Sequence, residues 1–377
     1  MDSFTNDLAH LLPYLLLLAA YLALSFHAEL TNKRVFALAS LTLLVLFAGL
    51  REPFTPDMER YRSMFESPGL LSPLFIEPSF ILISKGLKAL SFDYHALYLT
   101  YTVITLGFVY GAINKLTEHV RLALLIYVSI PACFLNLFVE MRQVSAVAIA
   151  FYATSILLTS DTRHRLLKVL AWAILSVLFH YSALLYWLVL LCSYKLVQRS
   201  YPPVLHIAAI CASLLIPTSA LMAGFSFLMS PFLPAKMQAY VDLFAQSRSS
   251  LAEPGQLLKS AVYVVMGIFF VLRLRRHEHG LRFRILVNLF VLGVIILNLT
   301  RDFAEVSRIA FFFLIYQIIL FPEILDEVTQ RVWSLMAGYL IVLFYMAQFM
   351  WGLLYFSEET NSYMFLHYQN AFYSLFR

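Results

Sequence analysis

Charged residues are scarce in this chain of 377 residues. Asp, Glu, Lys and Arg together make up 13% of it, about half of the ~25% found in soluble domains. Hydrophobic residues make up 61%, and the mean hydropathy is +0.78. The longest polar stretches are residues 51–73 and 224–256, which are too short for a water-soluble domain. The composition therefore predicts a single integral membrane domain over residues 1–377.

Cysteine is also rare, and the chain lacks the basic start of a signal peptide. Cys133, Cys192 and Cys211 all lie in apolar runs, and an odd number there argues against a disulfide framework or a metal cluster. The N-terminus instead carries Asp2 and Asp7, so the first apolar run is predicted to remain as a span. No internal repeat is visible. The formal net charge of +5 is explained by membrane topology and not by nucleic-acid binding.

Apolar runs recur from end to end, and each is long enough to cross a bilayer as a helix of about 20 residues. The candidate spans are residues 8–27, 35–50, 95–113, 121–138, 143–160, 166–194, 204–223, 257–273, 283–299, 303–321 and 332–356. We therefore expect an all-α polytopic membrane protein with about 11–12 transmembrane helices.

Three basic loops set the expected topology, because cytoplasmic loops are enriched in Lys and Arg. They are residues 32–34, 163–168 and 273–284. Loops on one side of the membrane need an even number of crossings between them. The short segment 76–92, which carries Lys85 and Lys88, is therefore predicted to be an interfacial helix that does not cross.

The same parity argument predicts a break in the run 166–194. A single helix there would give an odd number of crossings between the second and third basic loops. Two short helices that meet near His180 on the outer side restore an even number, and broken helices occur where they line a cavity or site. An extra half-helix within 223–237 is the alternative. With the break, both termini and the loops 51–94 and 224–256 lie outside.

His180 stands near the middle of "AILSVLFHYSALLYWLVLL" (residues 173–191), in a run without Asp, Glu, Lys or Arg. An imidazole exchanges a proton near neutrality. A lone histidine in an apolar helix is commonly a hydrogen-bonded core residue. The predicted break instead puts His180 at the outer mouth of the protein, where it could act in chemistry, and both interpretations stay open.

Several arginines lie on the predicted outer side, although Lys and Arg are usually enriched on the cytoplasmic side. Arginine within a membrane is costly and usually faces a polar cavity or a paired charge, and its planar fork suits phosphate recognition. Arg301 and Arg308 are seven residues apart, so one helix face would present both. The candidate arginines are Arg51, Arg60, Arg62, Arg142, Arg301 and Arg308.

Each of these arginines also has a purely structural interpretation. Arg142 could pair with Glu140 or with another carboxylate and so hold helices together. Arg301 and Arg308 could both pair with Glu305, which lies between them. For Arg60 and Arg62 the alternative is a solvated loop.

Two acidic residues, Asp57 and Glu59, form the triplet "DME" in the first large outer loop. Acid-x-acid in such a loop could hold a divalent metal through its oxygens, although we do not favour a metal and expect no cofactor. Asp57 alone could act as a general base. It could equally be the N-cap of a helix that starts at "MERYRSMF".

The pattern of these segments resembles the EpsG family. "AGLREPFTPDMERYRSMF" is similar to the family's first outer loop, "FLNLFVEMRQVSAVAIAFYA" to its Arg-Gln signature, and "WAILSVLFHYSALLYWLVLL" to its helix centred on Phe-His-x-Ser. The stretches "AEVSRIAFFFLIYQIILFPEIL" and "FLHYQNAFYSLF" resemble its closing segments. One departure is that the family's Gly-Thr-Asp-Tyr reads "FTPDME" here, so Asp57 matches, whereas Glu59 has no counterpart and its metal role is in doubt.

The resemblance implies a Wzy-like exopolysaccharide or O-antigen polymerase related to the GT-C membrane glycosyltransferases. Such an enzyme acts on undecaprenyl-pyrophosphate-linked oligosaccharides at the outer face of the bacterial inner membrane. A flippase and a chain-length regulator are possible partners, besides the lipid bilayer. A flippase or exporter for the same lipid, or a membrane O-acyltransferase, is the alternative function.

This chemistry gives each candidate residue an expected role. His180 and Asp57 are the two candidates for the base that activates the acceptor hydroxyl, or for groups that position the donor and the acceptor. Charge-assisted hydrogen bonds from arginines would stabilise the departing pyrophosphate. The expected pyrophosphate ligands are Arg142, Arg301 and Arg308, with Arg51 and Arg60 for the second phosphate. The expected substrate-positioning residues are Tyr61, Gln143, Glu140 and Glu305.

Overall fold

The computed structural model describes most of the chain. The described residues are 2–31, 34–73, 75–160, 162–217, 254–276, 280–301, 304–326, 331–358 and 368–371. Within these ranges the regular structure is helical, apart from one isolated β-bridge between Arg51 and Asn370, so the all-α prediction is confirmed. The chain divides into two compact units, Met1–Ala183 with Phe321–Arg377, and Leu184–Leu320.

Four described helical stretches have both the length and the composition to cross a membrane. They are α5 (Tyr94–Leu116), α8 (Met141–Thr159), Leu257–Leu274 within α14 (Pro254–Arg276), and α15 (Leu281–Thr300). Shorter apolar stretches lie in α1 (Asp2–Thr31), α2 (Arg34–Gly49), α6 (Val120–Ser129), α10 (Ser182–Val197), α11 (Pro203–Leu215) and α19 (Arg331–Glu358). The protein is therefore a polytopic membrane protein, and the larger span count stays a prediction.

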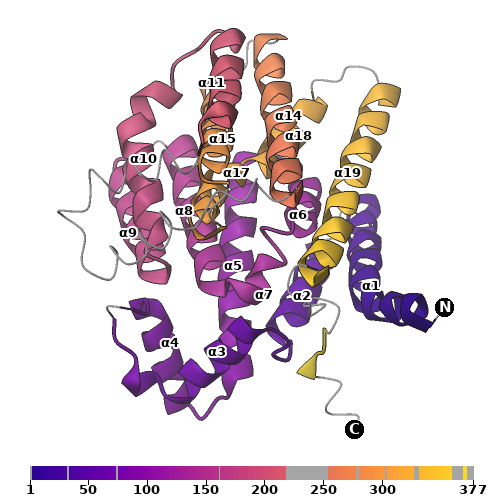
Figure 1. Cartoon of the computed structure of the whole chain (residues 1–377), viewed down its shortest axis with the longest axis vertical. Helices are drawn as coiled ribbons and strands as arrows, with labels where there is room; N and C mark the ends of the chain where they lie inside the picture. Colours follow the sequence, from indigo (N-terminus) through magenta and orange to yellow (C-terminus); the bar gives the residue numbers. More distant parts are fainter. Residues whose placement is uncertain are drawn as a thin grey trace. The chain divides into compact units, whose positions relative to one another are not determined.

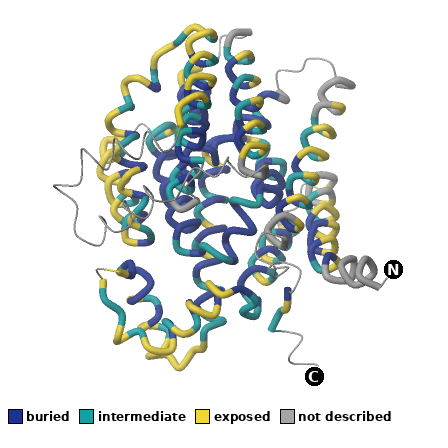
Figure 2. Tube along the Cα trace, in the orientation of Figure 1, coloured by how far each residue is buried: buried dark blue, intermediate teal, exposed yellow. Residues whose placement is uncertain are grey.

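Helix α8 is the centre of the first unit. It packs against α5 on one side and against α9 (Arg165–Phe179) on the other, and most of its residues are buried (Figures 1 and 2). Small residues along α8 let the neighbouring backbones approach closely. Ser145 of α8 shares a hydrogen bond of 2.6 Å with Thr105 of α5. This polar contact fixes the register of the two helices inside the apolar bundle.

The outer side of α9 carries an apolar stripe typical of a lipid-facing helix. Leu166, Leu170, Ile174 and Leu178 recur every four residues, and all four side chains are exposed. Residues at this spacing share one helix face. A stripe of this kind on a water-exposed helix would be an aggregation liability, whereas in a bilayer it contacts hydrocarbon.

Two short helices close one end of this bundle. Helices α3 (Pro56–Glu66) and α4 (Pro78–Ala89) both start at a proline and lie together at the end where α5 and α8 begin and α9 ends (Figure 1). Proline is favoured at a first helical position because the missing N–H would have no helical partner there. Helix α4, with 12 residues, is the separate short helix predicted at 76–92, and Lys85 and Lys88 are exposed.

The predicted break near His180 is confirmed. Helix α9 ends at Phe179, His180 is extended with φ −157° and ψ 128°, and α10 starts at Ser182. The His180 N–H still bonds to the Ser176 carbonyl at 3.0 Å, so the break falls between two well-formed helix ends.

One predicted single span, residues 121–138, is wrong because the structure breaks it. Residues 121–138 form α6 and α7 (Asn136–Val139) with a turn between them, since Pro131 lacks an N–H and disfavours helical geometry at the residue before it. The predicted span 303–321 is described from residue 304 on, as α16 (Ala304–Ser307), a 3₁₀ turn at Arg308–Ala310, α17 (Phe311–Leu314) and α18 (Gln317–Asp326). The backbone is right-handed helical at the junction residues Ser307, Ala310, Phe311 and Ile315, so this stretch is a helix with a 3₁₀ turn in it. Phe312, Phe313 and Leu314 are all buried, so this helix packs inside the second unit. The predicted outer loop 224–256 and the half-helix 223–237 lie largely or wholly outside the described residues.

Gly352 of α19 gives a first test of this packing. A Cβ at position 352 would lie 2.3 Å from Cγ of Pro131 and 2.6 Å from its Cβ. We expect Gly352→Leu to force the two elements apart and to lower the unfolding free energy by about 1–3 kcal/mol, as overpacked sites do. The melting temperature in detergent measures this. Gly107→Leu is the matched control, since a Cβ at Gly107 meets nothing within 4 Å. Equal melting temperatures for the two variants would show that Pro131 and Gly352 do not pack in this way.

Candidate functional site

A buried carboxylate, Glu77, joins two of the predicted site residues. Glu77 directly precedes α4, and its side chain is only 4% exposed. Its Oε2 forms an ion pair with Nη1 of Arg142, which lies in the first turn of α8. Its Oε1 lies 2.9 Å from Nδ1 of His180, at the junction of α9 and α10. Three segments that are remote in sequence therefore meet at one carboxylate.

The two basic side chains of this cluster are more exposed than its carboxylate. Arg142 and His180 are 20% and 29% exposed, whereas Glu77 is almost fully enclosed. The carboxylate thus has a partner for each of its oxygens inside the protein. Arg142 and His180 are partly exposed, so each still presents part of its side chain to the outside of the cluster. A guanidinium has five N–H donors and an imidazole has a second ring nitrogen. The cluster can therefore hold a ligand without losing its internal pairs.

The ionisation of Glu77 follows from these neighbours. Burial by itself raises the pKa of the carboxyl group, but the contact with His180 and the charge of Arg142 outweigh burial and hold the pKa below its ordinary value. Glu77 is therefore a carboxylate over the whole neutral range.

This lowered pKa predicts an acid-dependent stability. A carboxylate with a lowered pKa in the folded state contributes stability that is present above the unfolded-state pKa and is lost as the pH falls through the folded-state pKa. The loss of melting temperature caused by Glu77→Gln should be large at pH 7 and should shrink as the pH falls below the ordinary glutamate range of about 4.3. Glu59→Gln, at an exposed site on α3, is the control. Parallel melting curves against pH for wild type and Glu77→Gln would contradict the pairing.

Aromatic rings enclose the guanidinium of Arg142. Its Cζ lies 5.4 Å from the ring centre of Tyr61 and 5.9 Å from that of Phe80. These distances suit cation–π attraction. Burial raises the pKa of Tyr61, although Arg142, which hydrogen-bonds to the phenol, acts in the opposite direction. Tyr61 is thus a direct neighbour of Arg142, as its predicted positioning role requires.

The other predicted residues of α3 lie on its outer side. Asp57, Glu59 and Arg60 are exposed. The N-cap is Thr55, whose Oγ1 accepts from the Met58 N–H at 3.2 Å, so the N-cap interpretation of Asp57 is wrong. Asp57 sits in the first turn, where its charge suits the helix dipole, one turn before Tyr61. Among the described residues, no three His, Cys, Asp or Glu side chains are arranged to hold a metal ion.

Glu140 and Gln143 lie close to Arg142 in the sequence, and both are predicted to position the substrate. The carboxylate partner of Arg142 is Glu77, which is the "other carboxylate" alternative to Glu140. Glu140 accepts from Nδ2 of Asn136 at 3.5 Å, across the junction of α7 and α8. Gln143 is buried on α8. The substrate-positioning roles of Glu140 and Gln143 stay predictions.

Arg51 has a structural role and lies outside the cluster. It is fully buried, donates to the carbonyl oxygens of Ala48 and Leu137, and lies under the rings of Tyr98 and Phe138 at 4.6 and 4.9 Å. Burial lowers its pKa to about 10, so it remains charged at neutral pH. A guanidinium enclosed in this way has no surface for the second phosphate. The proposed site therefore leaves Arg51 out.

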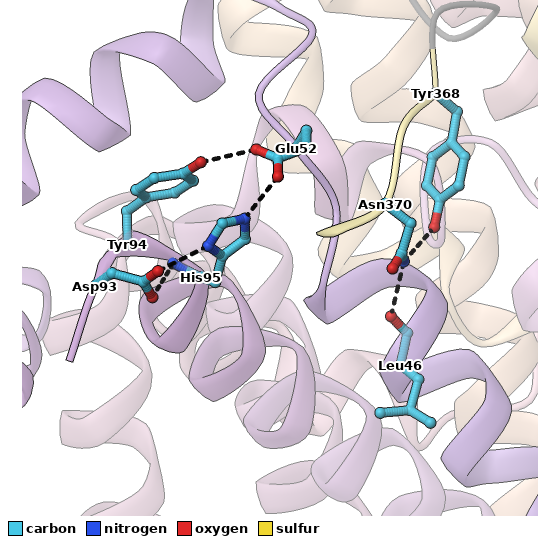
Figure 3. Close-up of polar contacts among 7 residues, drawn as sticks. All are labelled: Leu46, Glu52, Asp93, Tyr94, His95, Tyr368 and Asn370. Carbon is cyan, nitrogen blue, oxygen red and sulfur yellow. Dashed lines mark hydrogen bonds and ion pairs between the residues drawn. The ribbon is translucent and has the colours of Figure 1, made fainter. Parts of the chain in front are cut away.

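The chain segment around Arg51 is also held by a distant part of the sequence. Tyr368 stacks on Phe47 at 4.1 Å and donates to the Phe47 carbonyl at 2.7 Å. Asn370 donates to the Tyr368 hydroxyl and to the Leu46 carbonyl (Figure 3). Its backbone bridges to Arg51. Tyr368 and Asn370 thus secure the end of α2, next to the loop that carries α3.

A second polar cluster, absent from the predictions, joins this loop to α5. The His95 ring lies between Glu52 and Asp93, with Nε2 3.2 Å from Glu52 Oε1 and Nδ1 3.0 Å from Asp93 Oδ2, and Tyr94 donates to Glu52 at 2.7 Å (Figure 3). These contacts pin the start of α5 to the loop. Because α5 packs on α8, they also support the end of the bundle at which Glu77 lies.

The remaining predicted arginines belong to the second unit. Arg301 follows α15 and donates to the carbonyl oxygens of Asn298 and Leu214 at 3.1 Å, where it complements the C-terminal ends of α15 and α11. Arg301 is the C-cap of α15, whereas Arg308 lies in the 3₁₀ turn after α16, so the two arginines belong to different helical elements. The Glu305 side chain lies outside what the structure describes. Pyrophosphate binding by Arg301 and Arg308 stays a prediction.

Comparison with known families agrees with the pattern of these segments. A family model for the EpsG family matches residues 34–370, nearly the whole chain. The chain belongs to the EpsG family. No curated protein and no solved structure matches it. The EpsG match includes all residues of the Glu77 cluster and extends to the segment that secures α2.

Glu77, the buried carboxylate of this cluster, is not among the site residues predicted from the sequence. Its signal was present but weak, as a single carboxylate directly before a proline in the apolar segment "IEPSFILISKGLKALSF". An acidic residue before Pro is a common helix start, so the pattern alone favours a capping role. Yet the Glu77 side chain makes no cap hydrogen bond, because both oxygens face Arg142 and His180.

Proposed function

We propose that this EpsG-family protein is a Wzy-type polysaccharide polymerase. It transfers a growing glycan from an undecaprenyl-pyrophosphate donor to a sugar hydroxyl of a lipid-linked repeat unit, at the outer face of the bacterial inner membrane. The observation that carries the proposal is the buried carboxylate of Glu77, which holds His180 and Arg142 side by side at one end of the bundle.

The pair of Glu77 and His180 suits general base catalysis. A carboxylate at Nδ1 favours the tautomer with a proton on that nitrogen and leaves the Nε2 lone pair free to accept a proton. In the proposed reaction the acceptor hydroxyl oxygen bonds to the anomeric carbon, and its proton passes to Nε2 of His180. The bond from the anomeric carbon to the pyrophosphate oxygen breaks, and the pyrophosphate leaves with the electron pair. Glu77 stabilises the imidazolium until water takes the proton.

Arg142 is the proposed partner of the departing pyrophosphate. Negative charge grows on the leaving oxygen during bond cleavage, and a preorganised cation in a partly buried site stabilises that charge strongly. Tyr61 and Phe80 keep the guanidinium in place, and Glu77 fixes one of its edges. Asp57, exposed one turn before Tyr61, is proposed to position the acceptor, with Arg60 beside it for the second phosphate.

Glycan analysis in a strain that lacks the gene tests this function. A polymerase predicts that long polysaccharide disappears while single repeat units still reach the surface, and that the wild-type gene restores the long chains. If no repeat unit is exported, the protein is a flippase or exporter. If long polysaccharide persists but lacks acyl groups, the protein is an O-acyltransferase.

A further inference from the structure

An apolar cavity begins directly beside the Glu77 cluster. It has a volume of about 370 Å³ and lies among α4, α5 and α9. This size falls within the ~300–1,000 Å³ range of small-molecule sites. Its lining residues are Ser79, Leu82, Ile83, Ile104, Phe108, Leu175, Leu178 and Phe179. Seven of these eight side chains are hydrocarbon, so the cavity offers nothing to a sugar or a phosphate.

Two lining residues connect the cavity with the polar cluster. Ser79 follows Glu77 by two residues on α4, and Phe179 directly precedes His180. Tyr101 of α5 lies between them, with its hydroxyl 3.4 Å from Ser79 Oγ and its ring 5.5 Å from that of Phe179. Ile104 and Leu175 lie about one turn further along α5 and α9. The cavity therefore runs from the charged cluster into the membrane-spanning part of the bundle.

The outer edge of the cavity faces the lipid side of the protein. Leu178 belongs to the exposed apolar stripe of α9, and Leu82 of α4 is 69% exposed. A hydrocarbon chain can therefore enter sideways from the bilayer, while a charged group on the same molecule stays at the cluster. Water would bind poorly there, because an apolar cavity offers it no partners.

We propose that this cavity binds the first part of the hydrocarbon tail of the lipid-linked donor, whose phosphate lies at Arg142 and His180. The identity of the lipid rests on the proposed function. The cavity orients the donor, because a tail fixed beside Phe179 sets where the phosphate and the anomeric carbon lie. The rest of the tail remains in the bilayer.

Photolabelling tests the location without any substitution. The probe is a long-chain polyprenyl phosphate that carries a diazirine near the phosphate end of its tail. We expect labelled peptides from α4, α5 and α9, and competition by unlabelled polyprenyl phosphate. Labelling elsewhere would overturn the inference. Equal labelling by a diazirine phospholipid that polyprenyl phosphate does not displace would assign the cavity to bulk lipid, and this also overturns it.

Kinetics with a cavity-filling variant test the role of the site. Ile104→Trp should raise KM for a long-tailed donor about tenfold, a typical effect of altered fit in an apolar pocket. For a short-tailed donor the two proteins should have the same KM. Val103→Trp, which adds the same ring at an exposed neighbouring position outside the cavity, is the control. An unchanged KM in Ile104→Trp for the long-tailed donor contradicts the inference.

Cavity labelling by a protein that elongates no glycan would instead refute the proposed function and leave the lipid site standing.

Discussion

Replacing His180 by alanine is expected to slow polymerisation by about 10²–10⁴-fold, the usual contribution of a general base. The ring is partly exposed and contacts one side chain, that of Glu77, so its loss should affect the reaction more than the fold. The rate is measured with purified protein in detergent as elongation of lipid-linked repeat units. His180→Gln should not rescue the rate, because an amide does not accept a proton at neutral pH.

His164→Ala is the matched control for this prediction. His164 is an exposed histidine directly before α9, at the other end of the same helix from His180. It should polymerise at the wild-type rate. Wild-type elongation by His180→Ala would mean that His180 is not the base, and Asp57→Asn would then be the next variant to measure.

Replacing Arg142 by alanine is expected to abolish detectable polymerisation and also to destabilise the protein. Removal of one partner of a buried ion pair typically costs about 3–5 kcal/mol, because the other charge is left uncompensated. Here that charge is Glu77, which is 4% exposed. The melting temperature in detergent and the elongation rate are measured on the same preparation.

A double variant separates the two effects of Arg142. In Arg142→Ala with Glu77→Gln the unpaired charge is gone, so much of the melting temperature should return, while the polymerisation rate should not. Arg60→Ala, at an exposed position on α3, should change the melting temperature little. If the double variant regains both stability and activity, Arg142 serves only the fold.

The break near His180 and the end of the bundle at which the site lies could be predicted. Both follow from the positions of the basic loops and the lengths of the apolar runs. Basic loops and the lengths of apolar runs favoured a break near His180, and the structure has the break at that residue. The same argument placed His180 and Arg142 at one end of the bundle, where they are joined by Glu77. Each crossing moves the chain to the opposite side of the membrane. The prediction therefore depends on the number of crossings and is unaffected by small errors in where individual helices end.

The partner of Arg142 could not be predicted in this way. Glu77 and Arg142 are 65 residues apart, and nothing in the pattern selects one carboxylate from the several on the same side. Arg51 shows the same limit, because a buried arginine that bonds to carbonyl oxygens looks in sequence like one that binds phosphate.

Elongation by the purified wild-type protein tests the central claim most directly. The protein is incubated with lipid-linked single repeat units as the sole substrate, with EDTA present, and the products are separated by chain length. The proposed metal-free reaction at Glu77, His180 and Arg142 predicts a ladder of longer lipid-linked chains. Repeat units that stay single with and without EDTA would contradict the polymerase. A ladder that EDTA abolishes would contradict the metal-free mechanism.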